Sequence, residues 1–406
     1  MRRIAMRRIC GVVGGVVIVW ASAAGVAGAQ GVPPPPVAHE GARVTVYASG
    51  LDDPRGLAFS PSGVLYVAEA GTTEGTFVPP PPPPPGEPPT QTRCEVYWPV
   101  GPATPGFTGR ISRIGPDGSR TTVVDGLPSF GANTLIGGDR MGVSAVAFRG
   151  ERLFAVLAGG GCSHGHASSP NGILRVHGDG TTRLLADLSG HLRSNTDSKN
   201  PADGDYEPDG TWYNLVSAFG ALYAVEPNRG VFVRVDHLGN VTRVADMIAK
   251  VASIDPAGDG DRTYSALVEH AGWFYFGTLG RIDADFAGSI YRLSKDGSTV
   301  EEVASGLHGV VGLAFDRQGR LYALETTAAG VAPPLSDPTA GRLVRVEGDG
   351  ALTPIVTNLA FPTAVTTGKN GELFISNCGY HCDDRSQFPP ALTSLRAGQI
   401  LKVEMP

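Results

Sequence analysis

Six segments recur along this chain, and five of them end in a polar residue that could do chemistry. In chain order, their end residues are Glu69, Leu157, Glu226, Thr278, Glu325 and Asn377. Three more polar residues enter or line the neighbouring segments, namely Arg55, Asn214 and His308. Carboxylate and amide oxygens can hold a calcium ion or position a water molecule for hydrolysis. If the side chains converge, the candidate calcium ligands, one of which would also be a general base, are Glu69, Asn214, Glu226 and Glu325. The further candidate ligand-binding residues are Arg55 and Asn377.

A structural role for the three glutamates is the alternative. Each carboxylate would then pair with a neighbouring arginine or backbone amide as part of the repeat. Residues 205–210 and 255–261 are acidic as well, but neither segment has the later bidentate glutamate of a calcium loop. We expect both to be acidic turns. The sequence contains no nucleophile elbow, phosphate-binding loop or dinucleotide fingerprint.

A repeated strand pattern must position these residues. A glycine, alternating apolar residues and one basic residue recur in six copies, at 109–114, 172–176, 230–235, 288–293, 341–346 and 398–403. Five copies run into a glycine-containing turn and a further apolar stretch, which indicates a hairpin. An aromatic-rich strand precedes each copy, and an inner strand such as 56–59 or 312–315 precedes that. Four strands in each of six units predict an all-β, six-bladed β-propeller, with its natural pocket at the mouth of the central channel.

The ends of the chain indicate how the ring closes. The sixth copy ends at Pro406, directly after its third strand, whereas residues 43–48 form a strand without a unit of its own. We expect this N-terminal strand to complete the last blade, which protects two sheet edges and sets the propeller at residues 43–406. An open or stacked β-array is the alternative, although such arrays need capping repeats that are not evident here.

Composition agrees with a β-rich fold. Of 406 residues, 56 are glycine and 33 proline, and only 18% are charged, which favours short strands and turns over surface helices. The formal net charge of −6 gives no attraction to nucleic acid or to an anionic membrane.

The first 29 residues are typical of a signal peptide. Paired arginines precede an apolar run from Ile9 to Val19, and Ala27-Gly28-Ala29 offers a cleavage site before Gln30. We therefore expect a protein that is exported to the periplasm or secreted, with no transmembrane span after cleavage; an uncleaved anchor is the alternative. Residues 30–42 are predicted to be a disordered proline-rich leader. Residues 72–107 are predicted to be an insertion, in which seven prolines at 79–85 form a stiff spacer or a lid; a recognition segment is the alternative.

Four cysteines follow the predicted signal peptide, namely Cys94, Cys162, Cys378 and Cys382. An even number in an exported protein favours two disulfides. Their places in the repeat favour the pairs Cys94–Cys162 and Cys378–Cys382. The alternative is a metal site, because residues 162–166 and 381–384 combine cysteine, histidine and aspartate.

Residues 51–59 and 62–71 of the opening unit, and further on residues 108–114, 124–129 and 222–226, carry a resemblance that covers about residues 43–406. In these segments the chain resembles the ScyD/ScyE family. The resemblance implies an exported six-bladed propeller associated with synthesis of a photoprotective pigment and without a settled catalytic activity. The opening motif is shared with NHL-repeat proteins, gluconolactonase-like hydrolases and soluble quinoprotein sugar dehydrogenases.

Two functional hypotheses follow. We favour a monomeric binding or scaffold protein that presents its insertion-rich face to a small molecule, a glycan or another protein. The alternative is a calcium-dependent gluconolactonase-like hydrolase at the channel mouth, but Thr278 provides no carboxylate where a fourth blade could supply one. A quinone-dependent dehydrogenase ranks third, because no paired base and cationic cradle for that cofactor is evident.

Overall fold

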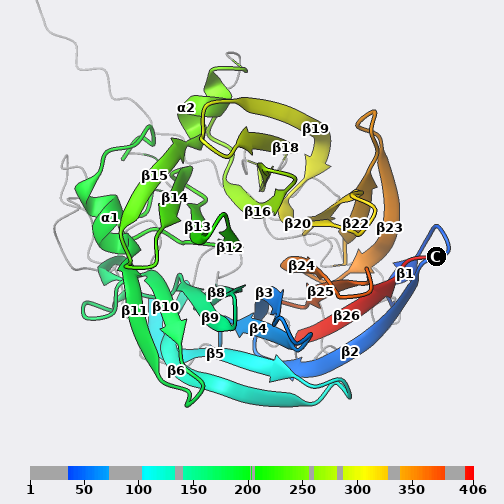
Figure 1. The fold of residues 1–406 in the computed structure, drawn as a ribbon, viewed down its shortest axis with the longest axis horizontal. Coiled ribbons are helices and arrows are strands. Elements are labelled where there is room, and N and C mark those ends of the chain that lie inside the picture. Colours follow the sequence, from blue (N-terminus) through cyan, green and yellow to red (C-terminus); the bar gives the residue numbers. More distant parts are fainter. Residues whose placement is uncertain are drawn as a thin grey trace, which may run out of the picture. The chain divides into compact units, whose positions relative to one another are not determined.

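A computed structural model gives the fold. It describes residues 35–72, 103–132, 140–201, 203, 206–255, 260–280, 287–327, 339–379 and 398–406. These residues belong to one compact unit, Val32–Pro406. Its six antiparallel sheets are arranged around a common axis, as the sequence predicts (Figure 1).

Each sheet is a blade whose strands follow one another outward. Blade one contains β3 (Pro54–Phe59), β4 (Leu65–Glu69), β5 (Ala103–Ile114), β6 (Arg120–Ala132) and the short β7 (Arg140–Met141). Blade two contains β8 (Val143–Arg149), β9 (Arg152–Leu157), β10 (Gly172–Val176) and β11 (Thr182–Asp187). Blade three contains β12 (Asn214–Ala218), β13 (Ala221–Glu226), β14 (Val231–Val235) and β15 (Val241–Asp246).

The other three blades repeat this order. Blade four contains β16 (Tyr264–His270), β17 (Trp273–Thr278), β18 (Ala287–Ser294) and β19 (Val300–His308). Blade five contains β20 (Val310–Phe315), β21 (Leu321–Glu325), β22 (Gly341–Val346), β23 (Leu352–Leu359) and the two-residue β1 (Val37–Ala38). Blade six contains β24 (Ala364–Thr367), β25 (Leu373–Asn377), β26 (Gly398–Glu404) and β2 (Arg43–Leu51). Helices α1 (Leu188–Ser194) and α2 (Met247–Ala252) follow the outer strands of blades two and three.

Aspartates shape the predicted turns between third and fourth strands. The side chain of Asp117 accepts the N–H of Ser119 at 3.0 Å, and Asp296 accepts the N–H of Ser298 at 3.1 Å. The glycine that follows Asp296, Gly297, has φ +73°, and a Cβ there would lie 2.6 Å from the carbonyl oxygen of Val244. Such a position requires glycine, which explains the recurring Asp-Gly pairs.

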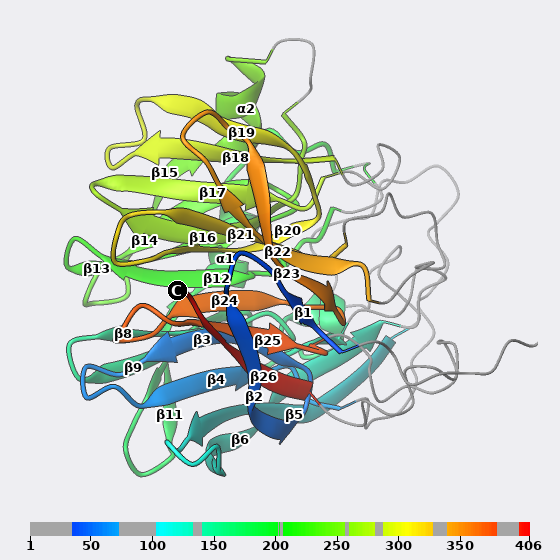
Figure 2. The ribbon, with the colours of Figure 1, turned by 90° about the vertical axis from the view of Figure 1, so that its right-hand side faces the viewer.

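The N-terminal segment closes the ring through two blades. Strand β2 pairs with β26, from Arg43 opposite Glu404 to Leu51 opposite Gly398, which confirms the predicted completion of the last blade (Figure 2). Strand β1 pairs with β23 in blade five. The leader predicted to be disordered at 30–42 is therefore ordered at Val37–Ala38, where backbone hydrogen bonds to an open sheet edge replace those to water.

Two sequence predictions fall largely on residues outside the described part. Of the insertion predicted at 72–107, residues 73–102 are not described, and β5 already begins at Ala103, so the extended β5–β6 hairpin takes up the end of that range. The signal peptide predicted at 1–29 is also outside the described part. No helix among the described residues is long and apolar enough to cross a membrane.

The core lies between neighbouring blades. Between blades three and four, for example, Phe232 packs edge-on against Phe276 with ring centroids 4.9 Å apart, and both rings are buried. Such contacts fix the inner strands, and with them the channel, in place.

Candidate functional site

Glu69, at the end of β4, is held within its own blade. Its Oε2 accepts the backbone N–H of Asp52 at 2.6 Å and lies 2.7 Å from Nη2 of Arg120, while its Oε1 accepts the hydroxyl of Ser112. The side chain is buried. Burial raises the pKa of Glu69, and the charge of Arg120 opposes that shift.

Glu226, at the end of β13, is held in the same way. Oε1 of Glu226 accepts the backbone N–H of Thr211 at 2.9 Å and the hydroxyl of Thr211 at 3.2 Å. Oε2 of Glu226 accepts the backbone N–H of Arg229 at 2.6 Å. Burial raises the pKa of Glu226 to about 7, although the two backbone hydrogen bonds favour the ionised form.

Blades five and six repeat the contact. Glu325 Oε1 accepts the N–H of His308 at 2.6 Å, and its carboxylate also pairs with Arg342. Asn377 Oδ1 accepts the N–H of Ala360 at 2.9 Å. In four blades, therefore, the residue ending the second strand accepts a backbone N–H from the segment that leads into the inner strand. We call these four contacts the blade latches.

The three carboxylates of the blade latches are already engaged. Each accepts a backbone N–H, and Glu69 and Glu325 pair with an arginine as well. Within the described residues, no group of three or more histidine, cysteine, aspartate or glutamate side chains could hold a metal. The contacts thus support the alternative in which each glutamate pairs with a neighbouring arginine or backbone amide.

Arg55 and Asn214 both make contacts between parts of the ring. Arg55 of β3 donates to the carbonyl of Arg140 in β7 of the same blade and, at 3.4 Å, to the hydroxyl of Tyr213 directly before blade three. Asn214 of β12 donates through Nδ2 to the carbonyl of Ser265 in blade four at 2.5 Å.

Similar bonds continue around the channel. The hydroxyl of Ser265 donates to the carbonyl of Val310 in blade five at 2.5 Å, and that of Thr363 donates to the carbonyl of Pro54 in blade one at 2.6 Å. Polar side chains around the channel therefore form hydrogen bonds between blades. The side-chain types alone do not reveal this role.

Two motifs considered separately in the sequence meet in space. Ser163 donates through its N–H and its hydroxyl to Asp209, both at 2.8 Å, and His164 Nε2 lies 3.1 Å from Oε2 of Glu207. His164 Nδ1 lies 2.5 Å from the carbonyl oxygen of Gly160, so only the imidazolium donates at both nitrogens. Burial alone would lower the pKa of His164, but its hydrogen bond and charge interaction with Glu207 raise it.

These contacts engage the described carboxylates of the predicted metal alternatives, whereas residues 381–384 lie outside the described part of the chain. The carboxylates of residues 205–210 that the structure describes, Glu207 and Asp209, pair with side chains of the 162–166 motif, and Asp209 also pairs with Arg193. In the second acidic segment, Asp255 pairs with Arg262, and Asp261 with Lys199 at 2.6 Å. The described carboxylates of both segments are thus paired within the protein, and the acidic turns stay a prediction.

Cys162 and Cys378 are disulfide-bonded. A disulfide sulfur is no thiolate ligand, which removes Cys162 from the predicted metal alternative. The proposed partners, Cys94 and Cys382, lie outside the described residues, so the pairing stays a prediction.

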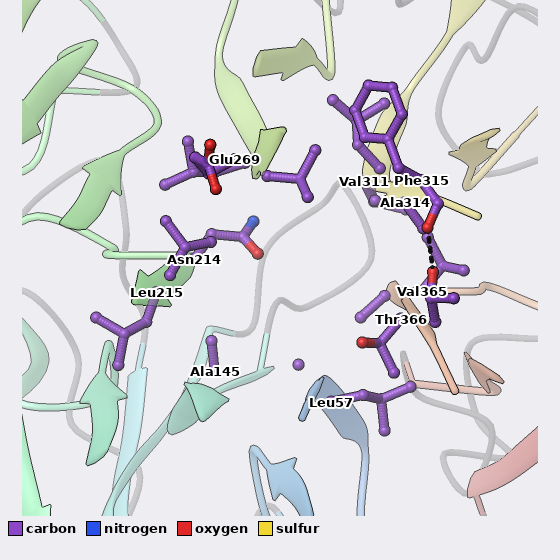
Figure 3. A pocket seen from close by; sticks show the side chains of 18 of the residues that line it. Leu57, Ala145, Asn214, Leu215, Glu269, Val311, Ala314, Phe315, Val365 and Thr366 are labelled. Carbon is purple, nitrogen blue, oxygen red and sulfur yellow. Dashed lines mark hydrogen bonds between the residues drawn. The ribbon is translucent and has the colours of Figure 1, made fainter. Parts of the chain in front are cut away.

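The channel contains a cavity of about 350 Å³ lined by all six inner strands. Apolar side chains such as Leu57, Val311 and Val365 line it together with polar ones, among them Asn214, Glu269, His270 and Asp316, and more of the exposed lining is polar than apolar. Figure 3 shows Asn214 and Glu269 on one side of the cavity and Val365 and Thr366 on the other.

Sequence reasoning missed Glu269. This half-buried side chain is close to the end of inner strand β16, where its Oε1 accepts the N–H of Gly272 at 3.0 Å. The signal that could have found it is a carboxylate in an inner strand, Tyr264–His270, directly after the apolar run Ala266–Val268. Next to it, the ring of His270 stacks on Phe315 with centroids 3.9 Å apart. Two carboxylates therefore line the cavity: Asp316, which pairs with Arg320, and Glu269, which no arginine or lysine of the described residues pairs with.

Comparison with known proteins shows the fold. A gluconolactonase from Xanthomonas campestris is similar over 92% of this chain and 97% of its own, with 13% identity and a TM-score of 0.53. A protein of unknown function from Bacteroides thetaiotaomicron is similar over 91% of this chain and 77% of its own, with 11% identity and a TM-score of 0.50. No family model and no curated protein matches the sequence. At these identities the likeness establishes the six-bladed propeller and leaves function to the site itself.

Proposed function

We propose that the chain is an exported binding propeller of the ScyD/ScyE type, whose channel cavity takes a small ligand that carries an amine beside an apolar group. The observation that carries this proposal is the carboxylate of Glu269, which lines the cavity without an arginine or lysine partner among the described residues. A half-buried carboxylate favours a cation over a neutral or anionic group, because the cation offsets its lost hydration. Apolar lining side chains such as Leu57, Val311 and Val365 contact the apolar part of the ligand.

The cavity explains why binding is preferred to hydrolysis. The acids predicted to activate water are engaged in the blade latches, whereas the cavity is large enough for a one-ring molecule. The ScyD/ScyE resemblance supports the same choice, because that family has no settled catalytic activity. A monomer that is periplasmic or secreted remains part of the proposal, as does recognition of a glycan or protein by the insertion-rich face.

Calorimetry with three probes of one size tests the cavity. We expect the protein that starts at Gln30 to bind benzylamine more tightly than benzyl alcohol, and benzyl alcohol more tightly than benzoate. The Glu269→Gln variant should lose the preference for benzylamine, whereas the control Glu302→Gln, an exposed glutamate on outer strand β19, should keep it. Equal binding of benzoate and benzylamine, or an unchanged preference in Glu269→Gln, contradicts the proposal.

Export is tested separately. The N-terminal sequence of protein recovered from the periplasm or the medium should begin at Gln30. A chain that retains residues 1–29 and remains with the membrane would show an uncleaved anchor instead.

A further inference from the structure

A second cavity, of about 200 Å³, lies between blade two and the turn that joins β14 to β15. It is lined by Arg149, Arg152, Phe154, Arg175, Arg183, Leu184, Leu185, His237 and Leu238. Four arginines around one small cavity are unexpected in a chain with a net charge of −6.

The strand register places the four arginines on one face of blade two. Arg149 pairs with Arg152 across β8 and β9, and Phe154 follows two residues after Arg152. Phe154 pairs with Arg175 across β9 and β10, and Arg175 pairs with Arg183 across β10 and β11. Directly opposed residues and residues two apart share a face, so all five side chains project to the same side of the sheet.

The other blades show that this arrangement is special. Each places an aromatic residue, a basic residue and a third residue in the same cross-strand row. In blades one, three, five and six the residue opposite the basic one is threonine, namely Thr121, Thr242, Thr353 and Thr45. In blade four it is Glu301, which pairs with Arg292 at 2.5 Å. Only blade two opposes arginine with arginine, which costs stability unless an anion lies between them.

The charge of the cluster is not neutralised within the described part of the chain. No hydrogen bond or ion pair there involves the side chain of any of the four arginines, and Nη1 of Arg149 is buried without a hydrogen-bond partner. Burial lowers the pKa of Arg149, and Arg152 and Arg175 lower it further. The carboxylate that opposes this shift, Asp236, is held by its own turn, where it accepts the N–H of Leu238 at 2.8 Å and of Asn240 at 2.9 Å.

The remaining groups that line this cavity include a phenylalanine ring and exposed leucines. The guanidinium of Arg149 lies over the ring of Phe154, 4.9 Å from its centroid, which fixes the orientation of its planar donors. Leu184 and Leu238 are 40% and 72% exposed, so the rim offers uncovered apolar surface.

From these observations we propose that the cavity bounded by Arg149, Arg152, Arg175 and Arg183 binds a phosphate or sulfate monoester of an apolar or aromatic group. Guanidinium forks match the oxygens of such an ester, and the leucine rim contacts its organic part. This site is distinct from the channel cavity and does not depend on the function proposed for it.

Calorimetry at low salt with phenyl phosphate, phenyl sulfate and inorganic phosphate tests the inference. We expect both esters to bind and inorganic phosphate to bind more weakly, because it lacks the ring. Arg175→Gln should weaken ester binding about tenfold or more, since a charge-assisted hydrogen bond is lost. The matched control is Arg234→Gln, at the same repeat position of blade three, and it should change binding little.

A second variant separates binding from folding. Arg183→Thr gives blade two the pair found in four other blades, so it should raise the melting temperature while it weakens ester binding. Three results would overturn the inference: neither ester binds, inorganic phosphate binds as tightly as the esters, or Arg234→Gln weakens binding as much as Arg175→Gln.

Discussion

The carboxylate of Glu226 accepts the backbone N–H of Thr211 at 2.9 Å, and this contact joins the end of β13 to the segment that enters β12. Blades one, five and six contain the equivalent contact. A backbone N–H that is buried without a partner costs free energy, so each blade latch satisfies a donor where the chain turns inward. Glutamates whose sequence positions suggest metal chemistry therefore fix the entrance of the inner strand to the end of the second strand.

The pKa of Glu226 predicts how stability depends on pH. The folded pKa of about 7 lies above the ordinary value of 4.5, so the folded state binds this proton more tightly than the unfolded state. Its contribution is present below about pH 4.5 and is lost as the pH rises through 7. The total change is on the order of 3 kcal/mol. Urea unfolding of wild type and Glu226→Gln between pH 4.5 and 8 should show a smaller decline in the variant, and parallel curves would contradict this account.

The pair of His164 and Glu207 adds a second pH-dependent contribution. The raised pKa of His164 means that the pair stabilises the fold fully below about pH 6.5 and less as the pH rises through the folded value. Glu207→Gln should cost about 3 kcal/mol at pH 5.5, as expected for a broken buried pair, and clearly less at pH 9.

His191→Gln is the control for that pair. Burial and two nearby arginines lower the pKa of His191. The contribution of His191 to the free energy of unfolding therefore grows as the pH rises, whereas that of His164 falls. A cost of Glu207→Gln that is the same at both pH values would show that His164 is neutral in the fold.

The bond from Asn214 to Ser265 predicts a contrast between two substitutions. Asn214→Ala should lower the free energy of unfolding by about 1 kcal/mol, because one hydrogen bond between blades is lost. Asn214→Asp should cost more at pH 7, where a carboxylate would face a carbonyl oxygen, and less at pH 4, where the protonated acid can donate. If Asn214→Asp is tolerated as well as Asn214→Ala at pH 7, the inter-blade role is wrong.

The two N-terminal strands predict different effects of truncation. A chain that begins at Gly41 lacks β1 and should melt a few degrees lower, because only the edge of blade five is uncovered. A chain that begins at Asp52 lacks β2 as well, leaves β26 unpaired, and should aggregate. Size-exclusion chromatography and thermal melts separate the two cases, and a monomeric, stable chain from Asp52 would contradict closure by β2.

The sequence predicts most of this fold because its signals are local. Turn residues and apolar alternation recur in every unit, so β10 and β22 have the bounds predicted at 172–176 and 341–346. The leader was less predictable, because pairing of β1 with β23 depends on where blade five offers a free edge.

The roles of the site residues could not be predicted in the same way. Period and spacing place Glu69 and Glu325 at strand ends, but whether a side chain turns toward the channel or back to a backbone N–H depends on the preceding loop. The contact of His164 with Glu207 brings together residues from two different loops. Arg183, in contrast, was accessible from the sequence, because alignment of the six units shows threonine at four equivalent positions.

Calcium-dependent stability is the most direct test of the central claim, that the blade latches are structural and that binding in the channel needs no metal. Thermal melts of protein stripped with a chelator should be the same with and without 1 mM calcium. A calcium site of 10 µM affinity would add about 2.7 kcal/mol at that concentration. A calcium-dependent rise that Glu69→Gln or Glu226→Gln abolishes would show that these carboxylates bind the ion after all.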